Sequence, residues 1–214
     1  MIYLSGFVGF LLVLTAEARV GNSSELNFCS ETEECLLFDL ICQTDDYEVR
    51  HYDSVNWVST QESSWSMDYA SISAFRRLFA YINGNNIEMT APVILKISDK
   101  TSFWQTGIYT MSFLLPAAHQ KNPIPPTDKK VYIKNMTDMQ VYVRSYGGWM
   151  MSWSDKSQAK ILSSDLDSAG AEYDRSFHYG VGYNSPIMVF DRHNEVWYVV
   201  QDDPVCGSSE EMGL

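Results

Sequence analysis

Basic residues are scarce in this chain. Its 214 residues include 15 Lys and Arg against 27 Asp and Glu, which gives a formal net charge of −12 at pH 7. No cluster of Lys or Arg interrupts this excess, so a polyanion would be repelled by the surface as a whole. The composition therefore argues against nucleic acid and anionic membrane surfaces as partners.

Long apolar runs are also lacking. Residues 7–14 are apolar but too few to cross a bilayer as a helix, which needs about 18 to 20 apolar residues, and no later segment approaches that length. Ala16-Glu17-Ala18 follows with the small-x-small pattern that signal peptidase requires. We therefore expect residues 1–18 to be a signal peptide and the mature protein to be secreted and extracellular, without stable membrane insertion.

Catalytic motifs are missing too. The sequence has no nucleophile with a base in motif context, no G-x-G-x-x-G fingerprint and no HExxH helix, and its Asp and Glu residues are scattered. We predict that the protein is not an enzyme.

Cysteine is used sparingly, at four positions, and an even count in an oxidising compartment favours disulfides. Cys206 lies far from the other three, so full pairing requires one bridge from the C-terminal end to the N-terminal segment. We favour Cys42 with Cys206 and Cys29 with Cys35. A zinc site is the rival interpretation, but the spacings are not the usual close pairs and no histidine is near.

Two triplets are candidate glycosylation sites in the same compartment, at Asn22 and Asn135. Glycosylation would require both asparagines to lie at the surface.

The chain resembles itself at an offset of 94 residues, because residues 48–52 match 142–146 and residues 90–93 align with 184–187. Between these segments, residues 67–82 place apolar side chains at the spacing of one helical face, and a second stripe begins near Ser154 or Asp155, either of which would serve as N-cap. The first stripe comprises Ile72, Phe75, Phe79 and Ile82, and the second Ala159, Leu162, Leu166, Ala169 and Tyr173.

Each half therefore predicts a strand, a helix and two strands, with the later strands at 93–97, 108–115, 187–191 and 196–201. Neither half buries its own sheet face, so we expect one shared core. The predicted fold is α+β, a distorted antiparallel β-barrel of two pseudo-repeats, at about 45–116 and 131–201, each with one flanking helix. Residues 19–44 are a cysteine-bearing extension, and residues 202–214 an acidic tail.

Several blocks carry a resemblance to a known family. Tyr47-Glu48-Val49-Arg50-His51-Tyr52, Met89-Thr90-Ala91-Pro92-Val93 and Asn194-Glu195-Val196-Trp197 stand in the order seen in the SOUL haem-binding family, and the match covers residues 45–201. The resemblance implies a distorted barrel with two flanking helices and binding of haem or a related tetrapyrrole. This chain departs from intracellular members in its signal peptide, cysteines and extensions.

The resemblance also implies site residues. His51 occupies the position of the histidine proposed to bind the haem iron in similar members, whereas the alternative is an ordinary strand histidine. Arg76 and Arg77 suit haem propionates, because a guanidinium fork matches a carboxylate, and are alternatively solvated helix residues. The bulky run at 149–153 is either a pocket wall or core.

Two functional hypotheses follow. The first is an extracellular haem or tetrapyrrole carrier or scavenger with haem as cofactor. The second is a secreted protein-interaction module on the same fold that does not bind haem, with an unknown protein partner.

Overall fold

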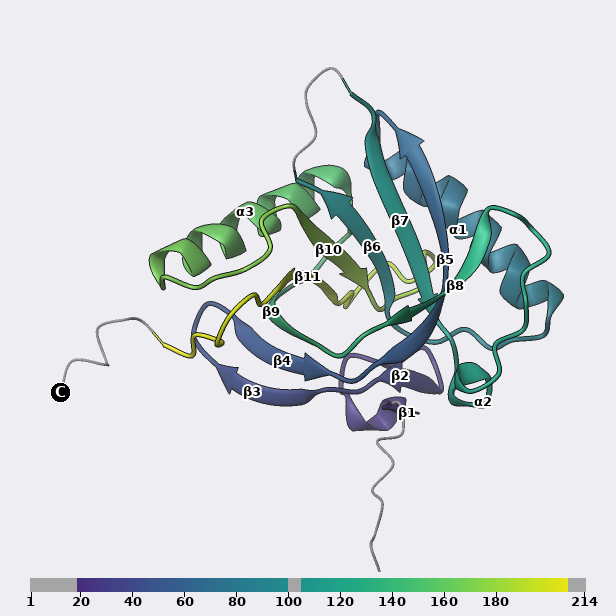
Figure 1. Cartoon of the computed structure of the whole chain (residues 1–214), viewed down its shortest axis with the longest axis horizontal. Coiled ribbons are helices and arrows are strands. Elements are labelled where there is room, and N and C mark those ends of the chain that lie inside the picture. Colours follow the sequence, from purple (N-terminus) through teal and green to yellow (C-terminus); the bar gives the residue numbers. More distant parts are fainter. Residues whose placement is uncertain (1–18, 100–104, 208–214) are drawn as a thin grey trace, which may run out of the picture.

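A curled, nine-stranded antiparallel sheet forms the body of the protein, in a computed structural model that describes residues 19–99 and 105–207 (Figure 1). The strand order is β3-β4-β9-β11-β10-β6-β7-β5-β8. These strands are β3 (Asp39–Gln43), β4 (Glu48–Tyr52), β5 (Val55–Ser64), β6 (Val93–Ser98), β7 (Gly107–Leu114), β8 (Val131–Met136), β9 (Met139–Tyr146), β10 (Phe177–Gly182) and β11 (Asn194–Val199). The predicted α+β fold with a distorted antiparallel barrel is confirmed.

Two pseudo-repeats of the pattern strand, strand, helix, strand, strand build this sheet. The first runs from β4 through the helix α1 (Met67–Gly84) to β7, and the second from β8 through the helix α3 (Ser152–Ser168) to β11. Their third strands, β6 and β10, begin 84 residues apart and pair with each other. The offset of 94 predicted from sequence is therefore wrong, because it aligned the first strand of one half with the second strand, β9, of the other.

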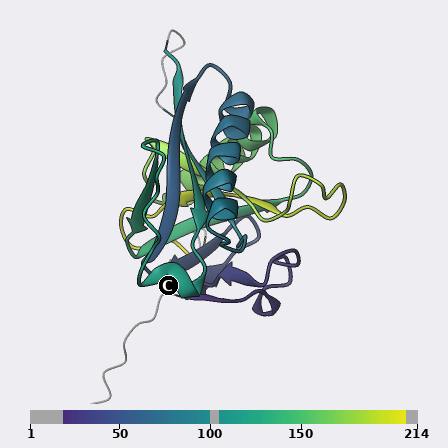
Figure 2. The same cartoon turned by 90° about the vertical axis from the view of Figure 1, so that its right-hand side faces the viewer.

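Three hydrophobic clusters hold the layers together. The inner, concave side of the sheet contains a cluster that includes Trp57 and Trp197, while α1 packs on the outer side of β5 and β7, and α3 on the outer side of β9 and β11. Both helices and the loop between β10 and β11 lie on the same side of the sheet (Figure 2). A short helix, α2 (Ala117–Gln120), follows β7.

Helix α1 turns a different face to the core than its apolar spacing predicts. The Ser66 hydroxyl accepts a hydrogen bond from the Tyr69 N–H as N-cap, and the helix ends at Gly84. Its buried side chains are Met67, Ala70, Ala74, Leu78, Tyr81 and Ile82, whereas Ile72 and Phe79 are exposed. Two of these residues, Ala70 and Ala74, are small and let the helix approach the sheet closely. Of the predicted stripe, only Ile82 is fully buried.

Helix α3 buries Ala159, Leu162 and Leu166 as predicted, but its N-cap lies three or four residues earlier than expected. The helix ends at Ser168, so the last two residues of the predicted stripe, Ala169 and Tyr173, lie beyond it. Its N-cap is Met151, and Ser154 accepts a hydrogen bond at its hydroxyl from the Met151 N–H. Ser154 and Asp155 therefore lie inside the first turn.

Strand β10 is the main element that the sequence prediction missed. Residues 187–191, predicted as a strand, lie in the loop between β10 and β11, and their apolar side chains are largely exposed. The sequence pattern of β10 is not typical of a strand, because Gly180 interrupts its apolar residues. A Cβ at this position would lie 2.5 Å from the Asp155 carboxylate, so only glycine permits the contact between β10 and α3.

The N-terminal extension is part of the fold. It contains a small sheet of β1 (Val20–Asn22) and β2 (Glu34–Leu36), a 3₁₀ turn η1 (Ser23–Glu25), and strand β3, which adds to one edge of the main sheet. Disulfides join Cys29 to Cys35 and Cys42 to Cys206, which is the pairing favoured from sequence.

Disulfides are typical of an oxidising compartment. The predicted signal peptide at residues 1–18 lies outside the described residues, as do the last seven residues of the acidic tail. Among the helices that the structure describes, none is long and apolar enough to cross a membrane.

Candidate functional site

An apolar groove lies between α1 and the loop of residues 183–193 that joins β10 to β11. It consists of two adjoining depressions of about 370 and 340 Å³, which share Phe75, Val93, Gly182, Asn184 and Pro186. We call this surface the helix groove. The stripe of α1 that the sequence predicted as core forms one of its walls, so the apolar pattern of this helix reflects two surfaces, a core face and a groove face.

Exposed hydrophobic side chains continue the helix groove onto the surrounding surface. Ile187 and Phe190, in the 183–193 loop, are 88% and 78% exposed, and Ile72 of α1 is 54% exposed. Trp149 and Met151 line the groove and are also exposed. The residues 149–151 thus form a pocket wall, one of the two interpretations of the bulky run at 149–153. Large exposed apolar surfaces commonly mark binding sites.

Two arginines border the helix groove in different ways. Arg192 donates hydrogen bonds to the carbonyl oxygens of Ser185 and Met188, at 2.7 and 2.6 Å, and its guanidinium lies 4.2 Å from the Trp149 ring centroid. It therefore holds the 183–193 loop against the groove. Burial lowers the pKa of Arg192, against an opposing effect of Glu31. Arg76 is exposed, and no ion pair joins it to any residue in the described parts of the chain.

Arg77, the other predicted propionate ligand, already has partners. It forms ion pairs with Glu62 and Asp128 and donates a hydrogen bond to the Thr60 hydroxyl. These contacts tie α1 to β5 and leave Arg76 as the guanidinium of the pair that faces the groove.

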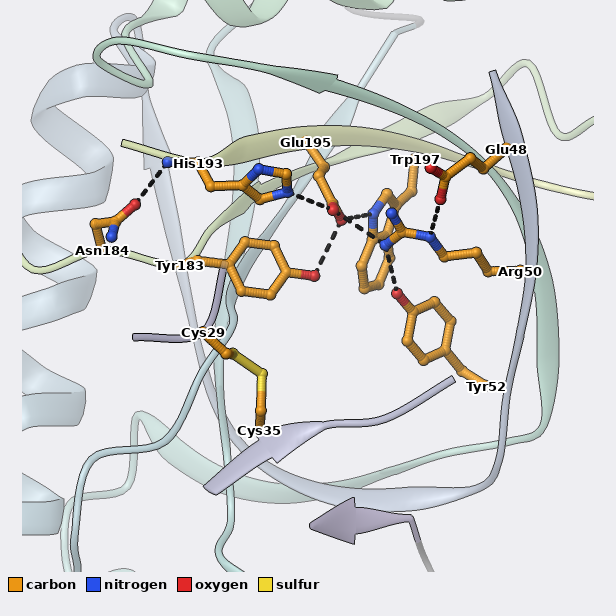
Figure 3. A network of polar contacts seen from close by, with 10 residues as sticks. All are labelled: Cys29, Cys35, Glu48, Arg50, Tyr52, Tyr183, Asn184, His193, Glu195 and Trp197. Carbon is orange, nitrogen blue, oxygen red and sulfur yellow. Dashed lines mark hydrogen bonds and ion pairs between the residues drawn. A yellow bond between two sulfur atoms is a disulfide. The ribbon is translucent and has the colours of Figure 1, made fainter. Parts of the chain in front are cut away.

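Behind the 183–193 loop, a buried polar network crosses the inside of the half-barrel (Figure 3). Glu195, which is 0% exposed, accepts hydrogen bonds from Arg50, Tyr183 and Trp197 and contacts the ring of His193 at 2.7 Å. Burial raises the pKa of Glu195, but Arg50 and the other donors outweigh it and lower the pKa to about 2. The carboxylate is therefore ionised, and its charge is balanced mainly by Arg50.

His51 lies on β4, and it is not among the residues that line the helix groove. Its Nε2 is 2.8 Å from Asp138 and its Nδ1 is 3.8 Å from Asp39. Burial lowers the pKa of His51, but these carboxylates outweigh it and raise the pKa. His51, Asp53 and Asp138 bring possible ligand atoms within 4.8 Å of one another. Exposed carboxylates often gather without a metal, so we assign no metal site here.

Both predicted glycosylation sites are at the surface, as glycosylation requires. Asn22 is exposed and caps η1, where its side-chain oxygen accepts from the Ser24 N–H. Asn135 is exposed on β8, the strand at one edge of the main sheet.

Comparison with known proteins decides the family. The model of the SOUL heme-binding protein family matches residues 33–199. The chain belongs to the SOUL family. It is 34% identical over 167 residues to heme-binding protein 2 of Homo sapiens, covering 76% of this chain and 82% of that protein. It is 27% identical over 158 residues to heme-binding protein 1 of Xenopus laevis, covering 72% of this chain and 83% of that protein.

Solved structures extend the likeness at the level of fold alone. The C-terminal domain of EcmrR has a TM-score of 0.54 at 9% identity, over 78% of this chain and all of that domain. The EcmrR–DNA complex has a TM-score of 0.58 at 7% identity, over 73% of this chain and 57% of the EcmrR chain. This SOUL family member therefore shares its architecture with proteins of unrelated sequence.

Sequence reasoning missed a second buried cluster in this SOUL family chain, centred on His178. Its two ring nitrogens lie 2.7 Å from Asp99 and 2.8 Å from Asp155. Burial lowers the pKa of His178, but these hydrogen bonds outweigh it and raise the pKa to about 9. Asp99 directly follows β6 and Asp155 belongs to α3, so only the folded chain brings them together. The contact could not be predicted because His178 lies on β10, the strand that the sequence prediction missed.

We expect this cluster to make stability fall at alkaline pH. Because the folded-state pKa of His178 lies above its ordinary value of 6.5, its contribution is fully present below pH 6.5 and is lost as the pH rises toward and through 9. Urea unfolding between pH 6 and 10 should show this decline in the free energy of unfolding. In His178→Gln the free energy of unfolding should change less over the same pH range. The control is His119→Gln on α2, which contacts neither carboxylate. An unchanged slope in His178→Gln would refute the assignment.

Proposed function

We propose that this protein binds haem or a related tetrapyrrole in the helix groove and acts as an extracellular carrier or scavenger. The observation that carries the proposal is an apolar groove with exposed aliphatic and aromatic walls and, at its border, the guanidinium of Arg76, which forms no ion pair with another described residue. Porphyrin faces are apolar and flat, and their propionates are carboxylates. The residues present therefore fit such a ligand, and membership of the SOUL family supports it.

Different residues of the helix groove would contact different parts of the ligand. Phe75, Ile72 and Trp149 would pack against the ring, and Arg76 would pair with a propionate. Arg192 would act indirectly, because its bonds to the loop carbonyls position the opposite wall. Haem would supply an iron centre when bound. We propose a binding role rather than a catalytic one.

The predicted axial role of His51 requires a different placement. His51 lies outside the groove lining, and its nitrogens face carboxylates, so a haem that it ligates would lie near β3 and β4. The disulfides and the proposed signal peptide support an extracellular setting. In that setting the exposed asparagines Asn22 and Asn135 would be glycosylated.

A haemin titration followed at the Soret band tests the groove. We expect Ile72→Asp and Arg76→Ala to weaken binding about tenfold or more each, since a loss of about 1.4 kcal/mol corresponds to a factor of ten. Both side chains are exposed, so folding should be little affected. Ile161→Asp, at an exposed position of α3, is the matched control.

His51→Ala separates the two placements in the same titration. Wild-type affinity in His51→Ala together with weak binding in the groove variants supports the groove. The reverse result would place haem at His51. Absence of saturable binding would favour the second candidate, a protein-interaction module, for which the exposed Ile187 and Phe190 of the 183–193 loop offer an apolar contact surface.

A further inference from the structure

The floor of the helix groove contains a row of three residues, one on each of three neighbouring strands. Gly182 of β10 pairs in register with Val93 of β6 on one side and with Asn194 of β11 on the other. Cross-strand partners point to the same face of a sheet, and all three residues line the larger depression of the helix groove. Because the middle position is glycine, the row has no side chain at its centre.

The missing side chain at Gly182 leaves a gap in this floor. The three nearest contacts of a Cβ at this position would be the Met150 methyl group at 3.8 Å, the Asn194 Oδ1 at 3.9 Å and the Met150 sulfur at 4.0 Å. These are ordinary van der Waals distances, so the gap is large enough for a methyl group. A glycine inside a strand often marks a place where a ligand approaches the backbone closely. There is therefore room for a ligand atom over Gly182.

The Asn194 side chain presents an unused hydrogen-bond acceptor to this gap. Asn194 is 0% exposed, and its Nδ2 donates a hydrogen bond to the Gly148 carbonyl oxygen at 2.7 Å. Because only Nδ2 can donate to that carbonyl, the orientation of the amide is fixed. The remaining atom, Oδ1, is buried and has no hydrogen-bond partner in the part of the chain that the structure describes. A buried acceptor without a donor is unfavourable, so a ligand donor that reaches Oδ1 would gain a hydrogen bond and remove that cost.

Met150 covers this acceptor and is able to move. Its methyl group and sulfur border the same gap as the Asn194 Oδ1, and Met150 lines the same depression. Methionine is unbranched and has three rotatable side-chain bonds, so it changes rotamer at small cost. A flat ligand on the floor of the groove would displace the thioether and reach Oδ1.

We infer that the helix groove recognises a linear tetrapyrrole, with a terminal lactam N–H of the ligand donating to the Asn194 Oδ1 over Gly182. This inference rests on the proposed function and narrows its ligand class. The ring nitrogens of haem bind iron and carry no hydrogen, and those of a metal-free porphyrin face the centre of the macrocycle. A linear tetrapyrrole has lactam N–H groups at its ends and keeps the propionates that would pair with Arg76. A site with a buried hydrogen-bonding group discriminates strongly against ligands that lack the matching group.

Titration of the disulfide-bonded chain with biliverdin tests the inference, and quenching of tryptophan fluorescence reports binding because Trp149 lines the groove. The comparison ligand is the lactim O-methyl ether of biliverdin, which keeps the conjugated chain and the propionates but has no N–H on its terminal rings. We expect saturable one-to-one binding of biliverdin, with an affinity at least about tenfold higher than that of the ether. In Asn194→Leu the two ligands should bind equally, while haemin should bind as it does to wild type.

Gly182→Ala provides a second test that does not disturb the Asn194 hydrogen bond to Gly148. Its added methyl group meets neighbours only at van der Waals distance, so the variant should fold, but the methyl group fills the gap over Oδ1. We expect biliverdin to bind it about tenfold more weakly or worse. Gly84→Ala, at the end of α1, is the matched control, because a Cβ there meets no atom within 4 Å and Gly84 does not line the groove.

Two results would overturn the lactam contact. One is equal affinity of wild type for biliverdin and its ether, and the other is an equal loss of biliverdin and haemin affinity in Asn194→Leu, which would indicate a structural role for Asn194. Saturable binding of haemin without binding of biliverdin would refute the inference and leave the proposed function standing. Absence of saturable binding for both ligands would refute the proposed function as well.

Discussion

Replacement of Arg50 by methionine should lower the free energy of unfolding by about 3–5 kcal/mol, because it leaves the buried carboxylate of Glu195 without its main counter-charge. Arg50 is 2% exposed and donates to Glu195 at 3.0 Å. Its guanidinium also stacks 4.1 Å from the ring centroid of Phe38, in the N-terminal extension. Urea denaturation monitored by tryptophan fluorescence measures the loss.

Two further variants show whether the loss of stability in Arg50→Met comes from the broken ion pair or from the removal of an arginine side chain in general. The double variant Arg50→Met/Glu195→Gln removes both charges and should recover much of the lost stability, since no uncompensated ion stays buried. Arg175→Met removes an arginine whose pair with Asp167 is exposed, and it should change stability little. A small effect of Arg50→Met alone would mean that the network does not hold the half-barrel together.

The Arg50–Glu195 pair also determines how the stability of the protein changes at acidic pH. The folded-state pKa of Glu195, about 2, lies below its ordinary value of 4.5, so its contribution is present above pH 4.5 and is lost as the pH falls toward 2. Without Arg50, the main cause of that lowering is gone and the pKa should rise. The gap in stability between wild type and Arg50→Met should therefore narrow at pH 3 compared with pH 7.

Removal of the Cys42–Cys206 disulfide should have the second large effect. The bond closes a loop of 164 residues, and loop-closure entropy in the unfolded chain predicts a loss of about 5 kcal/mol for Cys42→Ser/Cys206→Ser. The Cys29–Cys35 bond spans 6 residues, for which the same relation predicts about 2.2 kcal/mol.

Denaturation under non-reducing conditions compares the two disulfide variants, with Cys29→Ala/Cys35→Ala as the reference for a short loop. Both of these cysteines are buried, so their variant also carries a packing loss. A loss below about 2 kcal/mol for the long loop would show that its unfolded state is not governed by chain entropy.

Much of the fold could be predicted from sequence where each element has one role. The strands β6 and β7 follow their expected ranges closely, and α3 buries the first three residues of its predicted stripe, since these apolar residues serve only the core. The two pseudo-repeats were also predictable. Their alignment was not, because the matching strands β4 and β9 are neighbours in the sheet and share its pattern without holding equivalent positions.

Prediction failed where apolar residues have a second use. Ile72, Phe79 and Ile187 are hydrophobic but exposed around the helix groove. The spacing of Ile72 and Phe79 therefore predicted the wrong buried face of α1, and Ile187 contributed to the prediction of a strand where the structure has a loop. Strand β10 was hidden for the opposite reason, since the approach of Asp155 requires a glycine in a central strand. In both places the departure from simple patterning coincides with a candidate site or a buried charge cluster.

The site residues show the same division. Arg76 and the bulky run at 149–151, which were singled out by residue type, line the helix groove. Arg192 could not be identified, because its role depends on hydrogen bonds to the carbonyl oxygens of the 183–193 loop, which sequence spacing does not reveal.

The long disulfide also sets an order of events during synthesis on the ribosome. Cys206 emerges 164 residues after Cys42, whereas Cys29 and Cys35 emerge before Cys42. Until then Cys42 is a free thiol beside two others, and a wrong early bond from Cys42 to Cys29 or Cys35 would have to be reshuffled by thiol exchange before β3 could be fixed to the C-terminal segment. The Cys42–Cys206 bond therefore forms after the Cys29–Cys35 bond can form, and pulse-labelled chains should accumulate first as a species with a single short-range bond.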